Sequence, residues 1–179
     1  RASVALGVVP GRGADDGEAS VVLTQRAMHL SRHRGQFALP GGRIDPGETP
    51  VEAALRELHE EVDLELDESR VLGRLDDYVS RSGYHMTTAV VWADDSAEMV
   101  PNPDEVAAIH RVPLTLIADP KTRHMVDMDP GGPHVLSLAI VDTLVFAPTA
   151  AILLQLARLA VDGEVERIHA FEEPRFAWK

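Results

Sequence analysis

Three glutamates near the middle of the chain have a spacing that could bind a metal ion. Glu57, Glu60 and Glu61 stand at positions i, i+3 and i+4. On an α-helix they would share one face, and each like-charged pair would cost roughly 0.2–0.5 kcal/mol. Arg56 offsets only part of this charge. A hard divalent cation such as Mg²⁺ takes oxygen ligands and is often shared between carboxylates and the phosphates of a ligand, so this pattern favours a cation bound between protein and phosphate.

A solvated acidic helix face is the simpler interpretation of such a pattern, and two neighbouring features favour a site instead. Thr49-Pro50-Val51-Glu52 has the form of a capping box with proline at the first helical position, and a Gly-rich turn precedes it. The helix that follows carries an apolar face nearly opposite the glutamates. That face consists of Val51, Ala54, Leu55, Leu58 and Val62.

Length, charge and composition narrow the class of protein. A chain of 179 residues is expected to form one domain with a core of its own. The absence of cysteine excludes disulfides, thiolate catalysis and Cys-based zinc sites. A formal net charge of −12 argues against non-specific binding to nucleic acid. Residues 1–47, with six arginines against four carboxylates, could steer an anionic ligand toward the glutamate helix.

The remaining chain alternates apolar runs with turns, which predicts an α/β domain at residues 1–162 and a C-terminal tail of uncertain order at 163–179. The most apolar stretch, 143–161, is interrupted by Pro148, Gln155 and Arg158, so we expect a strand and a helix there and a cytoplasmic protein without a membrane span. That helix should begin at Pro148 and end at Gly163. Strands are predicted at 3–9, 19–25, 36–42, 71–79, 85–93, 106–114, 122–128, 134–140 and 142–146, with a loop at 26–37, a short helical turn near 114–118 and a hairpin loop at 129–133.

The glutamate segment resembles the signature of the Nudix hydrolases, G-x5-E-x7-R-E-U-x-E-E-x-G-U, where U is a bulky aliphatic residue. Asp63 stands where the signature has glycine. That glycine ends the helix, and Asp tolerates the left-handed backbone conformation better than most residues. The matching residues are Gly42, Glu48, Arg56, Glu57, Leu58, Glu60, Glu61 and Leu64.

The resemblance implies an α/β/α sandwich with a mixed β-sheet and a loop–helix–loop catalytic box. It also implies Mg²⁺ or Mn²⁺ as cofactor, with Glu57, Glu60, Glu61 and the Gly42 carbonyl as ligands. Glu48 and Arg56 resemble the salt bridge that braces the loop against the helix. The reaction implied is hydrolysis of a diphosphate by a water molecule that the cation activates.

The general base is less well defined by the resemblance, because some family members use a glutamate of the box and others a carboxylate from a later loop. Glu105, in the acidic stretch Pro103-Asp104-Glu105-Val106, is our candidate, followed by Glu98 and Asp104. A merely solvated loop is the alternative.

Residues before the box resemble the additional motif of coenzyme A pyrophosphatases, L-L-T-x-R-S-x3-R-x3-G-x3-F-P-G-G. Leu23, Thr24, Arg26, Gly35, Pro40, Gly41 and Gly42 match it. Ser31 and Leu39 depart from it, and Arg32 or Arg34 could supply the missing charge. His85 faces the substrate if the similar segment 83–87 has the same role. The resemblance therefore implies contacts from Arg26, Arg32, Arg34, Gly35, Gly41 and His85.

Coenzyme A or an acyl-CoA is the leading substrate, giving 3′,5′-ADP and 4′-phosphopantetheine. Other diphosphates (ADP-ribose, a dinucleotide or a nucleoside triphosphate) and a non-catalytic nucleotide-binding module are the alternatives. The partner expected is a small diphosphate molecule, not a nucleic acid or a membrane, and a homodimer is compatible with the sequence.

Overall fold

A mixed sheet of eight strands forms the centre of this computed structural model, which describes residues 1–12, 17–80, 83–94, 98–127, 134–168, 171 and 174. The strands are β1 (Ala2–Pro10), β2 (Ala19–Arg26), β3 (Phe37–Ala38), β4 (Gly41–Arg43), β5 (Val71–Arg74), β6 (Tyr78–Val79), β7 (His85–Trp92) and β8 (Val106–Pro113). β1 and β7 are parallel, and the other pairs are antiparallel.

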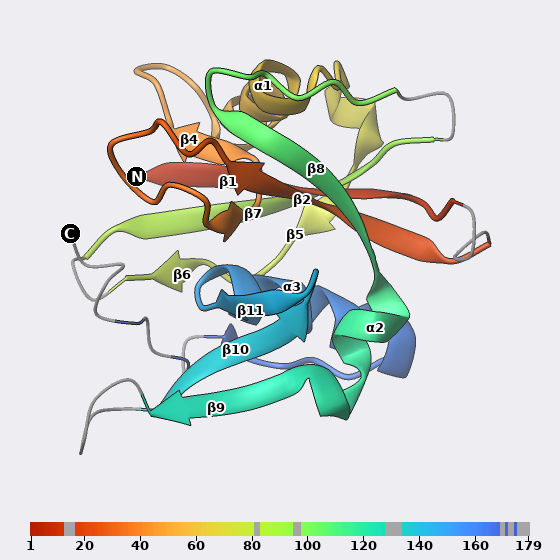
Figure 1. Ribbon diagram of the computed structural model, residues 1–179. Coiled ribbons are helices and arrows are strands. Elements are labelled where there is room, and N and C mark those ends of the chain that lie inside the picture. Colours follow the sequence, from red (N-terminus) through yellow and green to blue (C-terminus); the bar gives the residue numbers. More distant parts are fainter. Residues whose placement is uncertain are drawn as a thin grey trace.

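The two faces of this sheet are covered by different elements (Figure 1). Helix α1 (Pro50–Val62) covers one face. The other face carries α2 (Leu114–Ala118), α3 (Thr149–Ala157) and a second antiparallel sheet of β9 (Arg123–Asp127), β10 (His134–Ile140) and β11 (Thr143–Phe146). Short helical turns lie at Glu68–Arg70, Pro120–Thr122 and Arg158–Asp162. The expected α/β class, with a mixed sheet between helices, is confirmed.

Side chains alternate between these two layers, as strand geometry requires. Along β1, Ala5 and Val9 belong to the apolar cluster under α1, whereas Leu6 and Val8 pack with α3 and the second sheet. Because both faces of the central strands are buried, their sequences are almost continuously apolar.

The segment that precedes α1 fills a gap between two strands. β1 pairs with β2 only at its C-terminal end, from Val8 to Pro10, while its first residues pair with β4. β3 pairs with the far end of β2. The predicted single strand 36–42 is therefore two short strands, separated at Pro40, which lacks an amide hydrogen for the ladder. This arrangement carries the Gly-rich turn from one strand to its neighbour, directly beside α1.

Two further predicted elements differ in detail. The predicted strand 71–79 is broken into β5 and β6, and Gly73 has a positive φ of 157° where the register with β7 shifts. The predicted helix from Pro148 is α-helical only to Ala157; a π-helical turn follows, and Gly163 ends it in the left-handed conformation as predicted. The hairpin of β9 and β10 is confirmed, although its loop at 129–133 lies outside the described residues.

The start of the predicted tail packs on the domain. Ile168 is fully buried in the same cluster as α3, and the backbone carbonyl of Phe171 accepts a hydrogen bond from the Tyr78 hydroxyl at 2.9 Å. Among the described residues, no helix combines the length and apolarity needed to cross a bilayer.

Candidate active site

Helix α1 is fixed at both ends by the features that the sequence predicts. The hydroxyl of Thr49 accepts from the amide of Glu52 at 3.2 Å, and Glu52 Oε2 accepts from the amide of Thr49 at 2.7 Å. The helix ends at Asp63, which has a left-handed backbone conformation (φ 56°, ψ 36°) and donates its amide to the carbonyl of His59. The capping box and the helix end are confirmed.

The three glutamates of this helix have different environments. Its predicted apolar face packs on the sheet through Ala54, Leu55, Leu58 and Val62. Glu61 is 3% exposed and the Glu57 side chain 13% exposed, whereas the Glu60 side chain is 53% exposed. The three glutamates are thus not equally solvated, because β4 covers Glu57 and Glu61 and leaves Glu60 exposed.

The Gly-rich turn contacts the carboxylates of Glu61, which is buried, and Glu57, which is half-buried. The amide of Gly41 donates to Glu61 Oε1 at 3.1 Å. A Cβ atom placed on Gly42 would lie 2.2 Å from Glu57 Oε1, so only glycine permits this approach of backbone and carboxylate. The turn therefore lies directly against Glu57 and donates a backbone amide to Glu61.

Arg56 connects most of the remaining charges. Its Nε and Nη2 donate to the two oxygens of Glu48 at 2.7 and 3.2 Å, and Nη1 donates to Glu57 Oε1 at 2.9 Å and to Glu60 Oε2 at 3.0 Å. Nη2 also donates to the carbonyl of Arg43 at 3.0 Å. The hydrogen bond from Arg56 lowers the pKa of Glu48. The sequence-predicted pair Glu48–Arg56 is thus present and joins the loop to the helix.

Burial and neighbouring negative charges disfavour ionisation of Glu61 and Glu57. Burial, with a smaller contribution from the charges of Glu105 and Glu57, raises the pKa of Glu61 to about 7, although the Gly41 amide and Arg26 lower it. Burial also raises the pKa of Glu57, with Glu60 and Glu105 adding to the effect. Glu57, Glu61 and Glu105 therefore form one anionic centre, with Glu60 at its edge.

The loop before β8 brings Glu105 to this centre. The amide of Glu105 donates to the carbonyl of Asn102 at 3.0 Å, and its carbonyl accepts from the amide of Ala27 at 2.8 Å. Asp104 is exposed in the same turn, and its carbonyl lies 3.1 Å from His29 Nε2. Glu98 is exposed at the start of this loop. Asn102, which belongs to none of the sequence motifs, forms hydrogen bonds both to the end of α1 and within this loop.

The predicted substrate contacts are brought together only in part. Arg26 lies on the α1 side of the sheet and its charge acts on Glu61, while its Nε is buried without a hydrogen-bond partner. The amide of Gly35 donates to the carbonyl of Arg26 at 3.0 Å. Arg32 and Arg34 are exposed in this loop. His85 is exposed at the start of β7, on the other side of β1 from β4.

The described residues contain no group of three His, Cys, Asp or Glu side chains already gathered around a metal position. The ion pairs of Arg56 explain part of this arrangement, since they hold Glu57 and Glu60. The residues nevertheless fit a cation, because Glu57, Glu61 and Glu105 repel one another, and Glu57 lies against a turn that only glycine can form.

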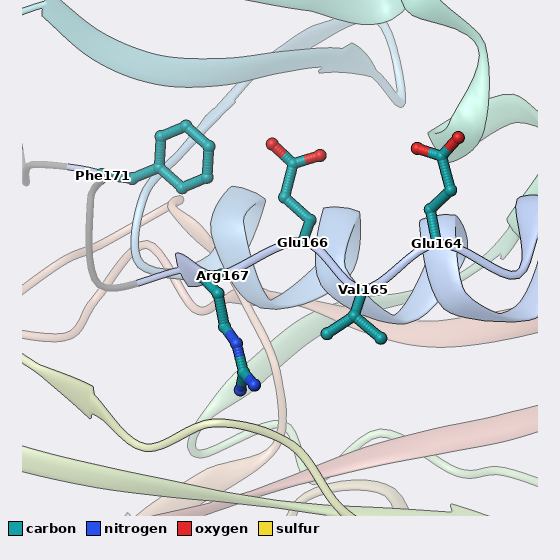
Figure 2. Close-up of a pocket in the computed structure, with 5 residues that line it drawn as sticks. All are labelled: Glu164, Val165, Glu166, Arg167 and Phe171. Atoms are coloured by element: carbon teal, nitrogen blue, oxygen red, sulfur yellow. The ribbon is translucent and has the colours of Figure 1, made fainter.

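A separate cavity of about 310 Å³ is lined by residues of the segment that follows α3. It lies on the face of the main sheet opposite α1. Figure 2 shows Glu164 and Glu166 pointing to one side of this segment and Arg167 to the other. Arg123 pairs with Glu166 at 3.0 Å and lies over the Phe171 ring. Buried Gln155 donates to the Glu166 carbonyl at 2.8 Å. The polar groups of Arg123, Gln155 and Glu166 bond to one another, so these contacts hold the segment after α3 against the domain.

Comparison with known proteins identifies the class to which this fold and site correspond. A family model described as the NUDIX domain matches residues 3–130, and the chain belongs to this family. It is similar to Nudix hydrolase 3 of Caenorhabditis elegans, with 40% identity over 103 residues that cover 55% of this chain and 43% of the relative.

A second relative covers more of the chain. It is named "Uncharacterized Nudix hydrolase NudL", from Yersinia enterocolitica serotype O:8 / biotype 1B, and is 35% identical over 144 residues, 79% of this chain and 74% of the relative. Among solved structures, a Nudix hydrolase from M. smegmatis, RenU, has a TM-score of 0.55 and 25% identity, covering 93% of this chain and 89% of that one. The chain spans less than half of the C. elegans protein. These names support the predicted hydrolase class and do not specify coenzyme A.

Proposed function

We propose that the protein is a metal-dependent Nudix pyrophosphohydrolase that cleaves the diphosphate of coenzyme A or an acyl-CoA. The observation that supports this proposal is that Glu57 and Glu61 of α1 lie against the Gly41–Gly42 turn, while the charge of Glu105, from the loop before β8, acts on both. Such an anionic centre suits a divalent cation shared with phosphate oxygens.

The cation would be Mg²⁺ or Mn²⁺, held by Glu57, Glu60, Glu61 and the carbonyl of Gly42. When bound, it supplies Lewis-acid activation of phosphate and water. Glu60 contributes only if it leaves Arg56, to which it is ion-paired at 3.0 Å. Arg56 would then remain on Glu48 through two hydrogen bonds and keep the loop against the helix.

Glu105 would act as general base and take a proton from the attacking water on its carboxylate. Its charge raises the pKa of both Glu57 and Glu61, which supports a role for it at the same centre. A group in this position can accept a proton beside the reacting phosphate. Glu98 and Asp104 are the weaker candidates.

Coenzyme A is supported by the cations at the end of β2 and in the loop that follows it. Arg26 lies at the carboxylates, and Arg32 and Arg34 are exposed further along the loop, so both a diphosphate and a second phosphate could be contacted. Gly35, Gly41 and His85 complete the proposed contacts. Hydrolysis would give 3′,5′-ADP and 4′-phosphopantetheine. We also predict that the protein is cytoplasmic and that it can form a homodimer.

Product analysis with purified protein and Mg²⁺ or Mn²⁺ tests this proposal. Coenzyme A, dephospho-coenzyme A, ADP-ribose, a dinucleotide and a nucleoside triphosphate should be compared by kcat/KM. We expect coenzyme A to be preferred, and Arg32→Ala with Arg34→Ala to reduce that preference over the dephospho form. Equal or better turnover of another diphosphate would overturn the substrate assignment.

The metal site is tested separately. Glu57→Gln and Glu61→Gln should each lower kcat by roughly 10²-fold or more, because cation stabilisation of the transition state contributes several kcal/mol. Circular dichroism should show an unchanged fold. Full turnover in either variant would exclude the proposed site.

A further inference from the structure

The loop that carries Glu105 closes the C-terminal end of helix α1. The last carbonyl groups of a helix have no partner within the helix. Here the carbonyl of Val62 accepts from the amide of Val100 at 2.9 Å, and the carbonyl of Glu61 accepts from the amide of Asn102 at 2.9 Å. The carbonyl of Glu60 accepts from the Asn102 side-chain Nδ2 at 3.1 Å. Two of these three carbonyls are therefore satisfied by one residue.

The other polar groups of Asn102 organise the turn that leads to Glu105. Its side-chain Oδ1 accepts from the amide of Asp104 at 3.1 Å. Its backbone carbonyl accepts from the amides of Glu105 at 3.0 Å and Val106 at 2.8 Å. Every hydrogen-bonding group of Asn102 is thus used, on one side toward the helix and on the other toward the base.

Asparagine suits this position because its side chain both donates and accepts. Aspartate would lose the Nδ2 donor and add negative charge at a helix C-terminus, where the dipole disfavours it. The carbonyl of Glu105 is held from the opposite side by the amide of buried Ala27. The backbone of Glu105 is therefore fixed between the substrate-side loop and the helix that carries Glu57 and Glu61.

We infer that Asn102 is a positioning residue, which holds the Glu105 carboxylate in register with the glutamates of α1. The inference rests on the proposed function, specifically on the role of Glu105 as general base. Asn102 itself contacts helix and loop backbone, so its contribution passes through the placement of Glu105.

A double-mutant cycle tests this coupling with the full chain, Mg²⁺ and the best substrate of the diphosphate panel. Asn102→Ala removes both side-chain hydrogen bonds and should lower kcat by about 10- to 100-fold, the order expected for a misplaced catalytic group, with KM changed less than threefold. In the Glu105→Gln background the same substitution should change kcat by less than threefold, because the group that it positions is already lost.

Val100→Ala is the matched control. Val100 lies in the same loop and its side chain is exposed. Its backbone amide donates a hydrogen bond to the Val62 carbonyl of α1, and this bond does not depend on the side chain. Its kcat should stay within twofold of the parent. Asn102→Asp, which keeps the Oδ1 acceptor and the backbone bonds, should also lower kcat, and it serves as the test if Asn102→Ala does not fold.

The outcomes separate this inference from the proposed function. If Glu105→Gln retains full kcat, the assignment of the base is wrong and the inference falls with it. If Glu105→Gln is impaired while the Asn102 variants match the parent, only the inference is overturned. An equal loss from Asn102→Ala in both backgrounds would also overturn it, because Asn102 would then act on α1 and not through Glu105.

Discussion

The carboxylate of Glu57 occupies the space into which a side chain on residue 42 would project. A Cβ atom there would lie 2.2 Å from Oε1 and 2.6 Å from the carboxyl carbon. Gly42 pairs with Ser3 in the sheet, so its backbone cannot easily retreat. The position of this glutamate is thus coupled to the absence of a side chain on a different element.

Gly42→Ala should therefore displace Glu57 without unfolding the domain. A methyl group at this point forces the carboxylate to rotate, which should raise the Mg²⁺ concentration for half-maximal activity by roughly 10- to 100-fold, the order seen when metal ligands lose their orientation. Titration of activity with Mg²⁺ measures the shift.

Arg43→Ala provides the comparison, since Arg43 is exposed and only its carbonyl contacts Arg56. Its Mg²⁺ requirement should match that of the parent. An unchanged requirement in Gly42→Ala would show that Glu57 does not depend on this contact.

The sequence predicts the helix, its cap and its apolar face because these depend on residues within one turn of each other. It does not predict that Glu61 is buried while Glu60 is exposed. That difference arises from β4, which reaches α1 only because β1 and β2 separate and admit the Gly-rich turn. The sequence also does not predict the role of Asn102, because its hydrogen-bond partners on α1 lie some 40 residues earlier in the chain.

Arg56 is expected to be more important for stability than a surface arginine. It is bound to both oxygens of Glu48 and to Glu57 and Glu60, and its side chain is 28% exposed. Arg56→Ala leaves these carboxylates without their cation, so the free energy of unfolding in metal-free buffer should fall by about 1–3 kcal/mol. Urea denaturation measures this change.

Arg56→Lys should recover only part of the loss, because an ammonium group cannot reproduce the planar two-point contact with Glu48. A lysine variant as stable as the parent would show that charge alone matters here and that the hydrogen-bond geometry does not.

Asp63 lies at the position where the family signature has glycine, and its left-handed conformation (φ 56°) is costly for a residue with a side chain. Its negative charge also opposes the helix dipole. Asp63→Gly should raise the free energy of unfolding by up to about 1 kcal/mol, seen as a higher melting temperature with unchanged kcat. A lower melting temperature would mean that the aspartate side chain makes a stabilising contact.

The stability of the metal-free protein should depend on pH through Glu61. Its pKa is raised from 4.5 to about 7, chiefly by burial, so between these values the folded state binds more protons than the unfolded chain. Stability from this group is therefore fully present below about pH 4.5 and is lost as pH rises through 7. The loss is at most about 3 kcal/mol.

Glu61→Gln removes the titrating group while keeping an oxygen that can accept from the Gly41 amide. In EDTA, the free energy of unfolding of the parent should decline between pH 5 and 8 relative to that of Glu61→Gln, whatever their difference at pH 5. Mg²⁺ should reverse the decline in the parent only, because a bound cation favours the ionised carboxylate. Parallel pH profiles in EDTA would show that the pKa of Glu61 is not raised in the folded protein, so that neighbouring groups already balance its negative charge without a metal ion.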